Sequence, residues 1–150
     1  MAAYSVLMQR TASTSLSVGT ITADATRPRR GLVYELDFGS EATPADNPYL
    51  WQVQRCTTAG TSTSVTPVPI NPADAATEAD GGTNHTIDPT LTASAMVLTI
   101  PLNQRATFRW VANPGCELIY PATASNGVAV RTPTAGGLLA ITCTLQFQEM

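Results

Sequence analysis

Hydrophobic and polar residues alternate with a period of two along most of this chain. Runs with apolar side chains at every second position cover residues 4–10, 14–23, 32–38, 50–57, 96–102, 106–112, 116–120, 128–132 and 138–148. A period of two places successive side chains on opposite faces of an extended strand, so that one face can pack on a core. The pattern predicts about eight to ten short strands and an all-β fold.

Turn residues separate these runs at short intervals. Asn113-Pro114-Gly115, Ser125-Asn126-Gly127 and Ala135-Gly136-Gly137 each stand between two runs, and Asn103-Gln104 joins residues 96–102 to 106–112 with the spacing of a tight hairpin. Short strands with regular turns are typical of an antiparallel sandwich or jelly roll. We therefore predict one antiparallel, jelly-roll-like β-sandwich domain over residues 1–150.

Residues 39–49 and 58–71 interrupt the alternation. The first segment, GSEATPADNPY, is predicted to be a long connection. The second is rich in Thr, Ser and Pro, and we predict an edge strand with a turn there. Pro67 and Pro69 favour an edge because proline cannot donate a ladder hydrogen bond.

One short helix is predicted over residues 72–79. Asn71 can cap its start, Pro72 suits the first helical position, and Asp74 would lie at the positive end of the helix dipole. Gly81-Gly82 would end the helix. We expect about two turns of helix within a loop.

The composition favours assembly of this protein with other subunits. The chain has no lysine, and its charged residues amount to 13%, against about 25% in an average soluble domain. Its polarity comes largely from 23 threonines, whose branched hydroxyl side chains suit a half-buried sheet surface. A weakly charged surface repels neighbouring copies less, so it favours dense packing with other subunits.

Charge and hydropathy exclude two classes of partner. A formal net charge of −3 argues against sequence-independent nucleic-acid binding, which needs a basic stripe. No apolar stretch approaches the roughly 20 residues that cross a bilayer, and residues 1–10 lack a secretory signal, so we expect synthesis in a cytoplasm. Free thiols are the expected state of Cys56, Cys116 and Cys143, and Cys143 is predicted to be a core residue.

The residues that carry catalysis in other proteins are nearly absent. His85 is the only histidine, no Gly-x-Ser-x-Gly elbow occurs, and the lack of lysine excludes Schiff-base and P-loop chemistry. Four acids, Asp74, Glu78, Asp80 and Asp88, lack the ligand spacing of a calcium loop. We predict no enzyme, and therefore no catalytic, cofactor-binding or metal-binding residues. A hydrolase using carboxylates such as Glu35, Asp37 or Glu117 stays open as a distant alternative.

Two stretches resemble a known group of proteins. LVYELDFGSEATPADNPYLWQVQRCTTAGTS (32–62) and NQRATFRWVANPGCELIYPATASNG (103–127) are similar to small structural proteins encoded among the virion genes of tailed bacteriophages, and a weaker likeness extends from about residue 4 to 148. The resemblance is greatest to capsid decoration, or cement, proteins. It implies a homo-oligomer, with a trimer favoured, that binds the major capsid protein on the capsid surface of the virion after synthesis in the bacterial cytoplasm.

Two segments are candidates for the partner interface. The terminal strand, residues 1–10, could dock by strand addition, and the arginine loop, residues 27–30, could pair with carboxylates. The candidate side chains are Tyr4, Val6, Met8, Arg10, Arg27, Arg29 and Arg30. On this hypothesis, deleting residues 1–10 leaves a folded protein that no longer binds capsids.

A tail or fibre module that binds host surface glycans is the alternative function. Trp51, Tyr49 or Tyr120 would then provide the stacking platforms for sugar rings.

Overall fold

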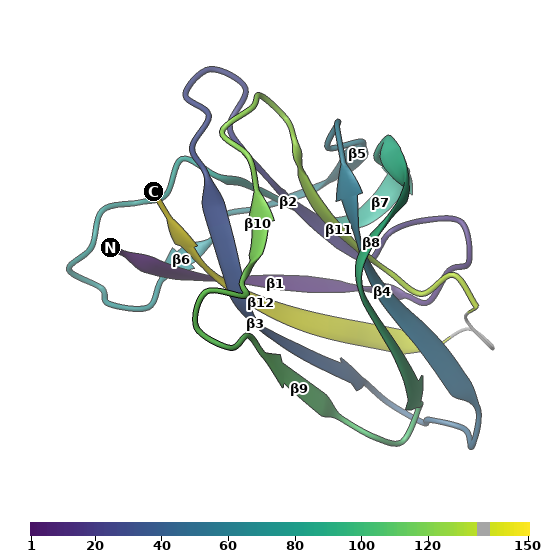
Figure 1. Ribbon diagram of the computed structural model, residues 1–150. Coiled ribbons are helices and arrows are strands. Elements are labelled where there is room, and N and C mark those ends of the chain that lie inside the picture. The colour runs from purple at the N-terminus through teal and green to yellow at the C-terminus, as the bar shows by residue number, and fades with distance from the viewer. Residues whose placement is uncertain (135–138) are drawn as a thin grey trace.

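The computed structural model describes residues 1–134 and 139–150 of the chain (Figure 1). Twelve strands lie in these ranges: β1 (Ala3–Thr11), β2 (Gly19–Thr22), β3 (Gly31–Ser40), β4 (Pro48–Cys56), β5 (Thr61–Val65), β6 (Val68–Pro69), β7 (Asp80–Ile87), β8 (Leu91–Asn103), β9 (Phe108–Val111), β10 (Leu118–Tyr120), β11 (Gly127–Arg131) and β12 (Ala140–Glu149). No helix occurs among the described residues. The prediction of an all-β fold is confirmed.

The strands form two antiparallel sheets. In the first sheet the order is β10-β3-β12-β1-β6, with β9 also paired to β3, and in the second it is β5-β7-β2-β11-β4-β8. Side chains of both sheets share one hydrophobic core, in which the rings of Phe38 on β3 and Trp51 on β4 lie 4.9 Å apart. Buried and partly buried residues alternate strictly along β12, as expected for a strand with one face on a core.

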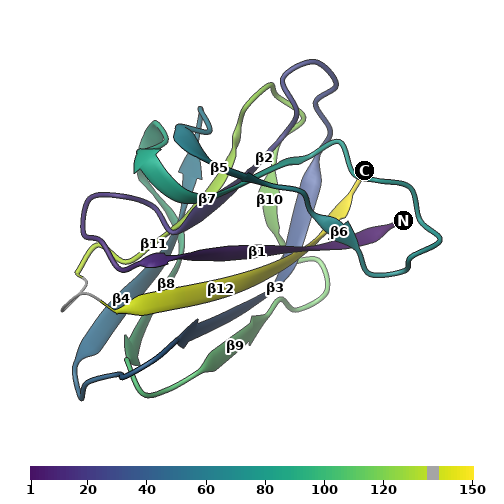
Figure 2. The same cartoon turned by 180° about the vertical axis from the view of Figure 1, so that it is seen from behind.

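The first strand of the chain is an interior member of its sheet. It pairs with β12 from Ala3↔Gln148 to Thr11↔Ala140, and with β6 on its other side through Tyr4↔Pro69. The two chain ends and β6 therefore lie at the same end of the molecule in both views (Figures 1 and 2). Pro69 occupies the end of the sheet order, in agreement with the edge position predicted for it.

The predicted helix at 72–79 is wrong. Asn71 does cap a turn, because its Oδ1 accepts from the Ala73 amide at 3.1 Å and its carbonyl accepts from the Asp74 amide at 3.0 Å. The chain then continues without helical turns to β7. An isolated helix of two turns has too few hydrogen bonds to offset its nucleation cost, so good capping alone does not produce one.

The pair Gly81-Gly82 belongs to a strand and does not stop a helix. Both residues lie in β7, where a Cβ at Gly82 would fall 2.3 Å from the Ser62 Oγ and one at Gly81 would fall 2.4 Å from the Val65 carbonyl oxygen. Strand β5 approaches β7 so closely here that only glycine fits.

The predicted hairpin through Asn103-Gln104 is also wrong. Strand β8 pairs with β4 in one sheet and β9 pairs with β3 in the other, so this short connection crosses between the sheets. Both runs carry core-facing side chains, and the alternating pattern alone does not reveal which neighbour each strand pairs with. Of the predicted strand at 14–23, only Gly19–Thr22 is extended as β2, and the predicted turn at 135–137 falls outside the described residues.

The two sides of the shared core differ. On one side, the Thr83 hydroxyl of β7 links the sheets, accepting from the Gln9 amide at 2.7 Å and donating to the Gln9 carbonyl at 2.9 Å. On the other side, between β8 and β9, Leu98, Ile100 and Trp110 pack on the core but remain partly exposed. The core is therefore closed along β1 and β7 and open along β8 and β9.

Candidate functional site

The apolar interface candidates on the terminal strand lie inside the molecule. Tyr4, Val6 and Met8 have relative exposures of 4%, 1% and 0%, and all three belong to the core. The Tyr4 hydroxyl also donates to the Ala75 carbonyl at 3.1 Å. Because these side chains point between the sheets, they could reach a partner only if β1 left its sheet.

A set of exposed apolar side chains lies on the opposite face of the same strand region. We call Leu7, Val68 and Ile70, together with Met1 and Met150, the terminal strip; their exposures run from 44% for Leu7 to 77% for Met1. Ser5, two residues before Leu7, pairs with Val68, and the Ile70 amide donates to the Ala3 carbonyl at 2.8 Å. Val68 and Ile70 thus lie beside the first residues of β1, at the end of the molecule that carries both chain ends and β6 (Figure 2), and Leu7 lies farther along β1, opposite Thr144.

The sequence contained a signal for this surface. Leu7 is apolar at a position where the alternation of Val6 and Met8 calls for a polar residue, and such a residue must face outward when its neighbours face inward. Val68 stands between Pro67 and Pro69, where a polar turn residue would be usual. Apolar side chains that gather into a contiguous patch at outward-facing positions are typical of a contact surface.

Arg10, the cationic candidate on the terminal strand, already has partners within the chain. Its Nη1 donates to the carbonyl oxygens of Ser17 at 2.9 Å and His85 at 3.1 Å, and its Nε donates to the Thr11 carbonyl at 2.8 Å. Burial lowers the pKa of this guanidinium, while Asp88 opposes the shift. Arg10 therefore holds β1 to the neighbouring loops.

The arginine loop lies beside the terminal strip. Arg27 forms an ion pair of 2.8 Å with Glu78, Arg29 lies 4.0 Å from Glu149, and the Arg30 carbonyl accepts from the Met150 amide at 2.9 Å. The side chain of Arg27 remains 73% exposed despite its ion pair. The loop therefore lies beside Met150, at one end of the terminal strip, and two of its arginines pair with carboxylates of the same chain.

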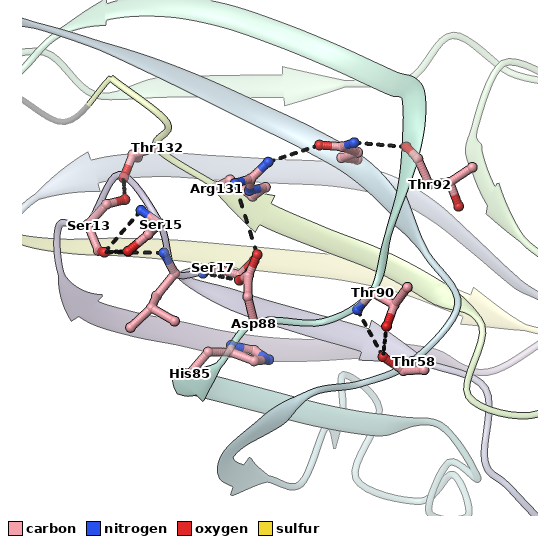
Figure 3. Close-up of polar contacts among 12 residues, drawn as sticks. Ser13, Ser15, Ser17, Thr58, His85, Asp88, Thr90, Thr92, Arg131 and Thr132 are labelled. Carbon is pink, nitrogen blue, oxygen red and sulfur yellow. Dashed lines mark hydrogen bonds and ion pairs between the residues drawn. The ribbon is translucent and has the colours of Figure 1, made fainter.

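A polar cluster, partly buried, lies on the outer face of the second sheet (Figure 3). Asp88 Oδ1 accepts from both the amide and the hydroxyl of Ser17 at 2.7 Å, and its Oδ2 lies 4.0 Å from Arg131 Nη2. Arg131 Nη1 donates to Gln54 Oε1 at 3.1 Å, and Gln54 Nε2 donates to the Thr92 carbonyl at 2.8 Å. These bonds connect the loops that contain Ser17 and Asp88 to β11 and β4.

The cluster contains a serine, a histidine and an aspartate, but its hydrogen bonds differ from those of a nucleophile relay. The Ser17 hydroxyl donates to Asp88, and His85 Nε2 lies 3.0 Å from the Ala59 carbonyl, which fixes the ring proton on Nε2. A relay needs the serine hydroxyl to donate to the imidazole. Ser17 and His85 are 0% and 1% exposed, so a substrate cannot reach them. The hydrogen bonds of the cluster therefore stabilise the fold.

The carboxylates named for a hydrolase do not meet in a cleft. Glu35 pairs with Arg109 at 2.5 Å, and this hydrogen bond lowers the pKa of the Glu35 carboxyl, so Glu35 stays ionised rather than serving as a general acid. Asp37 lies on the same strand beside a shallow hollow of about 230 Å³, which Glu35 does not line. The Glu117 carboxylate accepts from the Gly115 amide at 3.1 Å within the turn that precedes β10.

The aromatic side chains named as glycan platforms are core residues. Trp51, Tyr49 and Tyr120 are 2%, 1% and 0% exposed. A sugar ring cannot stack on a buried aromatic face. The glycan-binding alternative therefore has no stacking platform at these positions.

The acidic residues and the cysteines are dispersed. Glu78 and Asp88 are engaged as described, Asn71 Nδ2 donates to Asp74, and no group of three potential metal ligands occurs among the described residues. The three thiols are free, with Cys56 and Cys143 buried, as predicted for Cys143. Burial raises the pKa of the Cys56 thiol to about 12, so it is not a reactive thiolate at neutral pH.

A groove of about 420 Å³ lies where β1 approaches β7. Gln9, Glu41, Thr83 and Asn84 are among its lining residues, and Gln9 Nε2 donates to Glu41 Oε1 at 2.9 Å. The Thr142 hydroxyl donates to the same oxygen. The groove is open, its lining is partly apolar, and the Gln9 and Glu41 side chains within it bind each other.

Comparison with known proteins finds no matching family model, no similar curated protein and no similar solved structure. In the part of the chain that the structure describes, no helix has the length and apolar character needed to span a membrane.

Proposed function

We propose that this protein is a decoration, or cement, protein that binds the outer surface of a tailed-phage capsid and stabilises the mature head. The resemblance of residues 32–62 and 103–127 to virion structural proteins supports the proposal, as do the all-β architecture and the low charge. The proposal includes a jelly-roll connectivity, a homo-oligomeric state, and synthesis in the bacterial cytoplasm before addition to the virion.

The terminal strip is the single structural observation that carries the proposal. Leu7, Val68 and Ile70 are 44%, 62% and 51% exposed, so burying them against another protein is favourable at roughly 25 cal/mol per Å² of apolar surface. The arginine loop beside Met150 adds the means to orient the contact by pairing with carboxylates of the partner. The matching partner surface is an apolar patch with an acidic border on the major capsid protein.

Many weak contacts would make the attachment durable. A shell presents the same patch many times, and a homo-oligomer engages several patches at once, so modest individual affinities combine into a long-lived clamp. Bridging neighbouring capsid subunits in this way adds contact area at the junctions that internal pressure from packaged DNA would separate.

The test is co-sedimentation with expanded capsids assembled from the major capsid protein of the phage or prophage whose genome contains this chain. The wild-type protein should pellet with capsids in a saturable manner. The double variant Val68→Asp and Ile70→Asp should bind at least tenfold more weakly, because two carboxylates would be desolvated at the contact. Ile87→Asp is the matched control, since Ile87 is equally exposed at 62% but lies on β7, and it should bind like the wild type.

Two results would contradict the proposal. Wild-type protein that stays in the supernatant at all capsid concentrations would remove the capsid as the partner. Equal binding by the strip variant and the wild type would show that the contact lies elsewhere, and the terminal strip would lose its assigned role.

A further inference from the structure

The groove between β1 and β7 has the size and the polar groups of a small-ligand site. We call it the sheet-junction groove and define it by Gln9 of β1, Glu41 after β3, Thr63 of β5, and Thr83 and Asn84 of β7. Its volume of about 420 Å³ lies within the range of roughly 300–1,000 Å³ that small-ligand sites occupy.

Hydrogen bonds between the two sheets fix the shape of the groove. The Thr83 hydroxyl accepts from the Gln9 amide at 2.7 Å and donates to the Gln9 carbonyl at 2.9 Å. Along the wall formed by the first sheet, Glu41 Oε1 accepts from Gln9 Nε2 at 2.9 Å, and the Glu41 amide donates to the Ala140 carbonyl at 2.8 Å. A ligand would therefore meet a preformed groove, and its binding would order few additional groups of the protein.

A β-bulge in β7 brings Asn84 to this groove. Between the pairs Thr61↔Ile87 and Thr63↔Thr83 the ladder advances by two residues on β5 and by four on β7. Asn84 lies in the bulged segment with a φ of 51°, a left-handed conformation that asparagine adopts more readily than most other residues. Bulges of this kind change the direction of a side chain and are frequent beside functional sites.

The groove offers hydrogen-bonding groups that the fold leaves unused. Asn84 and Thr63 are exposed, and their side chains form no hydrogen bond within the part of the chain that the structure describes. The described hydrogen bonds of the Gln9 and Glu41 side chains use Gln9 Nε2 and Glu41 Oε1, which leaves the second polar atom of each for a ligand. Together these groups supply both donors and acceptors.

The chemistry of the groove is unfavourable for a peptide strand or a phosphate. The Thr83 hydroxyl occupies both main-chain groups of Gln9, so β1 cannot pair there with an added strand. A phosphate needs free cationic side chains. Arg10 also lines the groove, but its Nε and Nη1 already donate to three carbonyl oxygens of this chain, and the Glu41 carboxylate would repel an anion.

We propose that the sheet-junction groove binds a neutral saccharide. Sugar hydroxyls both donate and accept, so the Asn84 carboxamide binds two neighbouring hydroxyls while Glu41 Oε2 accepts from a third. The partly apolar lining suits the C–H surface of the sugar ring. The residues described as lining the groove include no aromatic ring to stack on the sugar, so binding is weak, with a dissociation constant of about 1 mM.

NMR titration of the purified, ¹⁵N-labelled full-length chain tests the proposal. The probes are the methyl glycosides of glucose, galactose, mannose, rhamnose and N-acetylglucosamine, each added to roughly 50 mM, well above the expected dissociation constant. At least one of them should shift the amide signals of Thr63 and Asn84 in a saturable manner. Inorganic phosphate at the same concentration should leave these signals in place.

Two variants test the assigned side chains. Asn84→Gly removes the carboxamide and keeps a backbone conformation that glycine adopts freely, so it should weaken binding at least fivefold without unfolding the protein. Thr63→Val removes one hydroxyl and should weaken binding by a smaller factor. Asn113→Gly is the matched control, because Asn113 is an exposed asparagine in the turn after β9, outside the groove, and this variant should bind like the wild type.

Three results would overturn the proposal. The first is the absence of saturable shifts with all five glycosides, and the second is binding that Asn84→Gly and Thr63→Val leave unchanged. The third is a larger response of the groove signals to phosphate than to any sugar. The titration contains no capsid and the co-sedimentation contains no sugar, so a missing saccharide site and a missing capsid contact are distinguishable.

Discussion

His85 shows how a residue that suggests catalysis can serve the fold instead. It is 1% exposed, and its Nε2 lies 3.0 Å from the Ala59 carbonyl. Burial lowers the pKa of the imidazole, with Arg10 contributing in the same direction, while the Ala59 and Ser17 carbonyls and Asp88 oppose the shift. The fold therefore requires the neutral ring.

This requirement makes stability depend on pH. The unfolded imidazole takes up a proton near pH 6.5, whereas the folded ring resists protonation until a lower pH, so the free energy of unfolding falls as the pH drops below 6.5. One histidine can account for at most about 1.4 kcal/mol of this loss at pH 5.5. Urea unfolding at pH 7.5 and at pH 5.5 measures this loss in the free energy of unfolding.

His85→Gln is the matched control for this effect. Glutamine can still donate to the Ala59 carbonyl but does not titrate, so the variant should lose less stability between the two pH values than the wild type. An equal loss in both proteins would assign the pH dependence to other groups.

Single elements were predictable from the sequence to different degrees. Strands β1, β3, β4 and β12 follow their alternating patterns closely, because each has one face on the core. Strand β7 was missed, since its double glycine carries no alternation signal and its need for glycine arises from β5, a strand adjacent only in space. Local sequence cannot report a close approach of that kind.

The same limit explains the errors at the candidate site. The pattern correctly places Tyr4, Val6 and Met8 on one face of a strand, but only the position of β1 between β12 and β6 shows that this face is buried. The exposed apolar side chain of β1 is that of Leu7, the residue that breaks the pattern.

Gly82→Ala tests the close approach of β5 to β7. The added Cβ would fall 2.3 Å from the Ser62 Oγ and 3.0 Å from the Thr20 Oγ1, so strands must shift, and we expect a loss of about 1–3 kcal/mol in the free energy of unfolding. Gly39→Ala on β3 is the control, because its Cβ would meet only the Thr107 Cγ2 at 3.4 Å. Chemical denaturation should give Gly82→Ala a lower free energy of unfolding than Gly39→Ala. Equal values would mean that β5 can move away from β7 without loss of stability.

At the scale of the whole molecule, the first and last strands of the chain pair with each other inside one sheet. Strands β1 and β12 pair along nine residues, and the Tyr4 and Phe147 rings from these strands lie 5.4 Å apart in the core. The chain ends are therefore part of the cooperative fold. This arrangement argues against the sequence-based hypothesis that deleting residues 1–10 leaves a folded protein, and we predict the opposite outcome.

Deleting residues 1–10 should abolish folding. The deletion removes Tyr4, Val6 and Met8 from the core and exposes the inner edge of β12; truncating even one large core side chain typically costs 2–5 kcal/mol, against a total stability of about 5–15 kcal/mol. Thermal unfolding followed by circular dichroism should show no cooperative transition for the truncated chain. The full-length variant Leu7→Ser, altered on the exposed face of the same strand, should melt within a few degrees of the wild type. A cooperative transition in the truncated chain would instead show that β12 and β3 hold the sheet without β1, and the terminal strand would again be free to exchange into a partner.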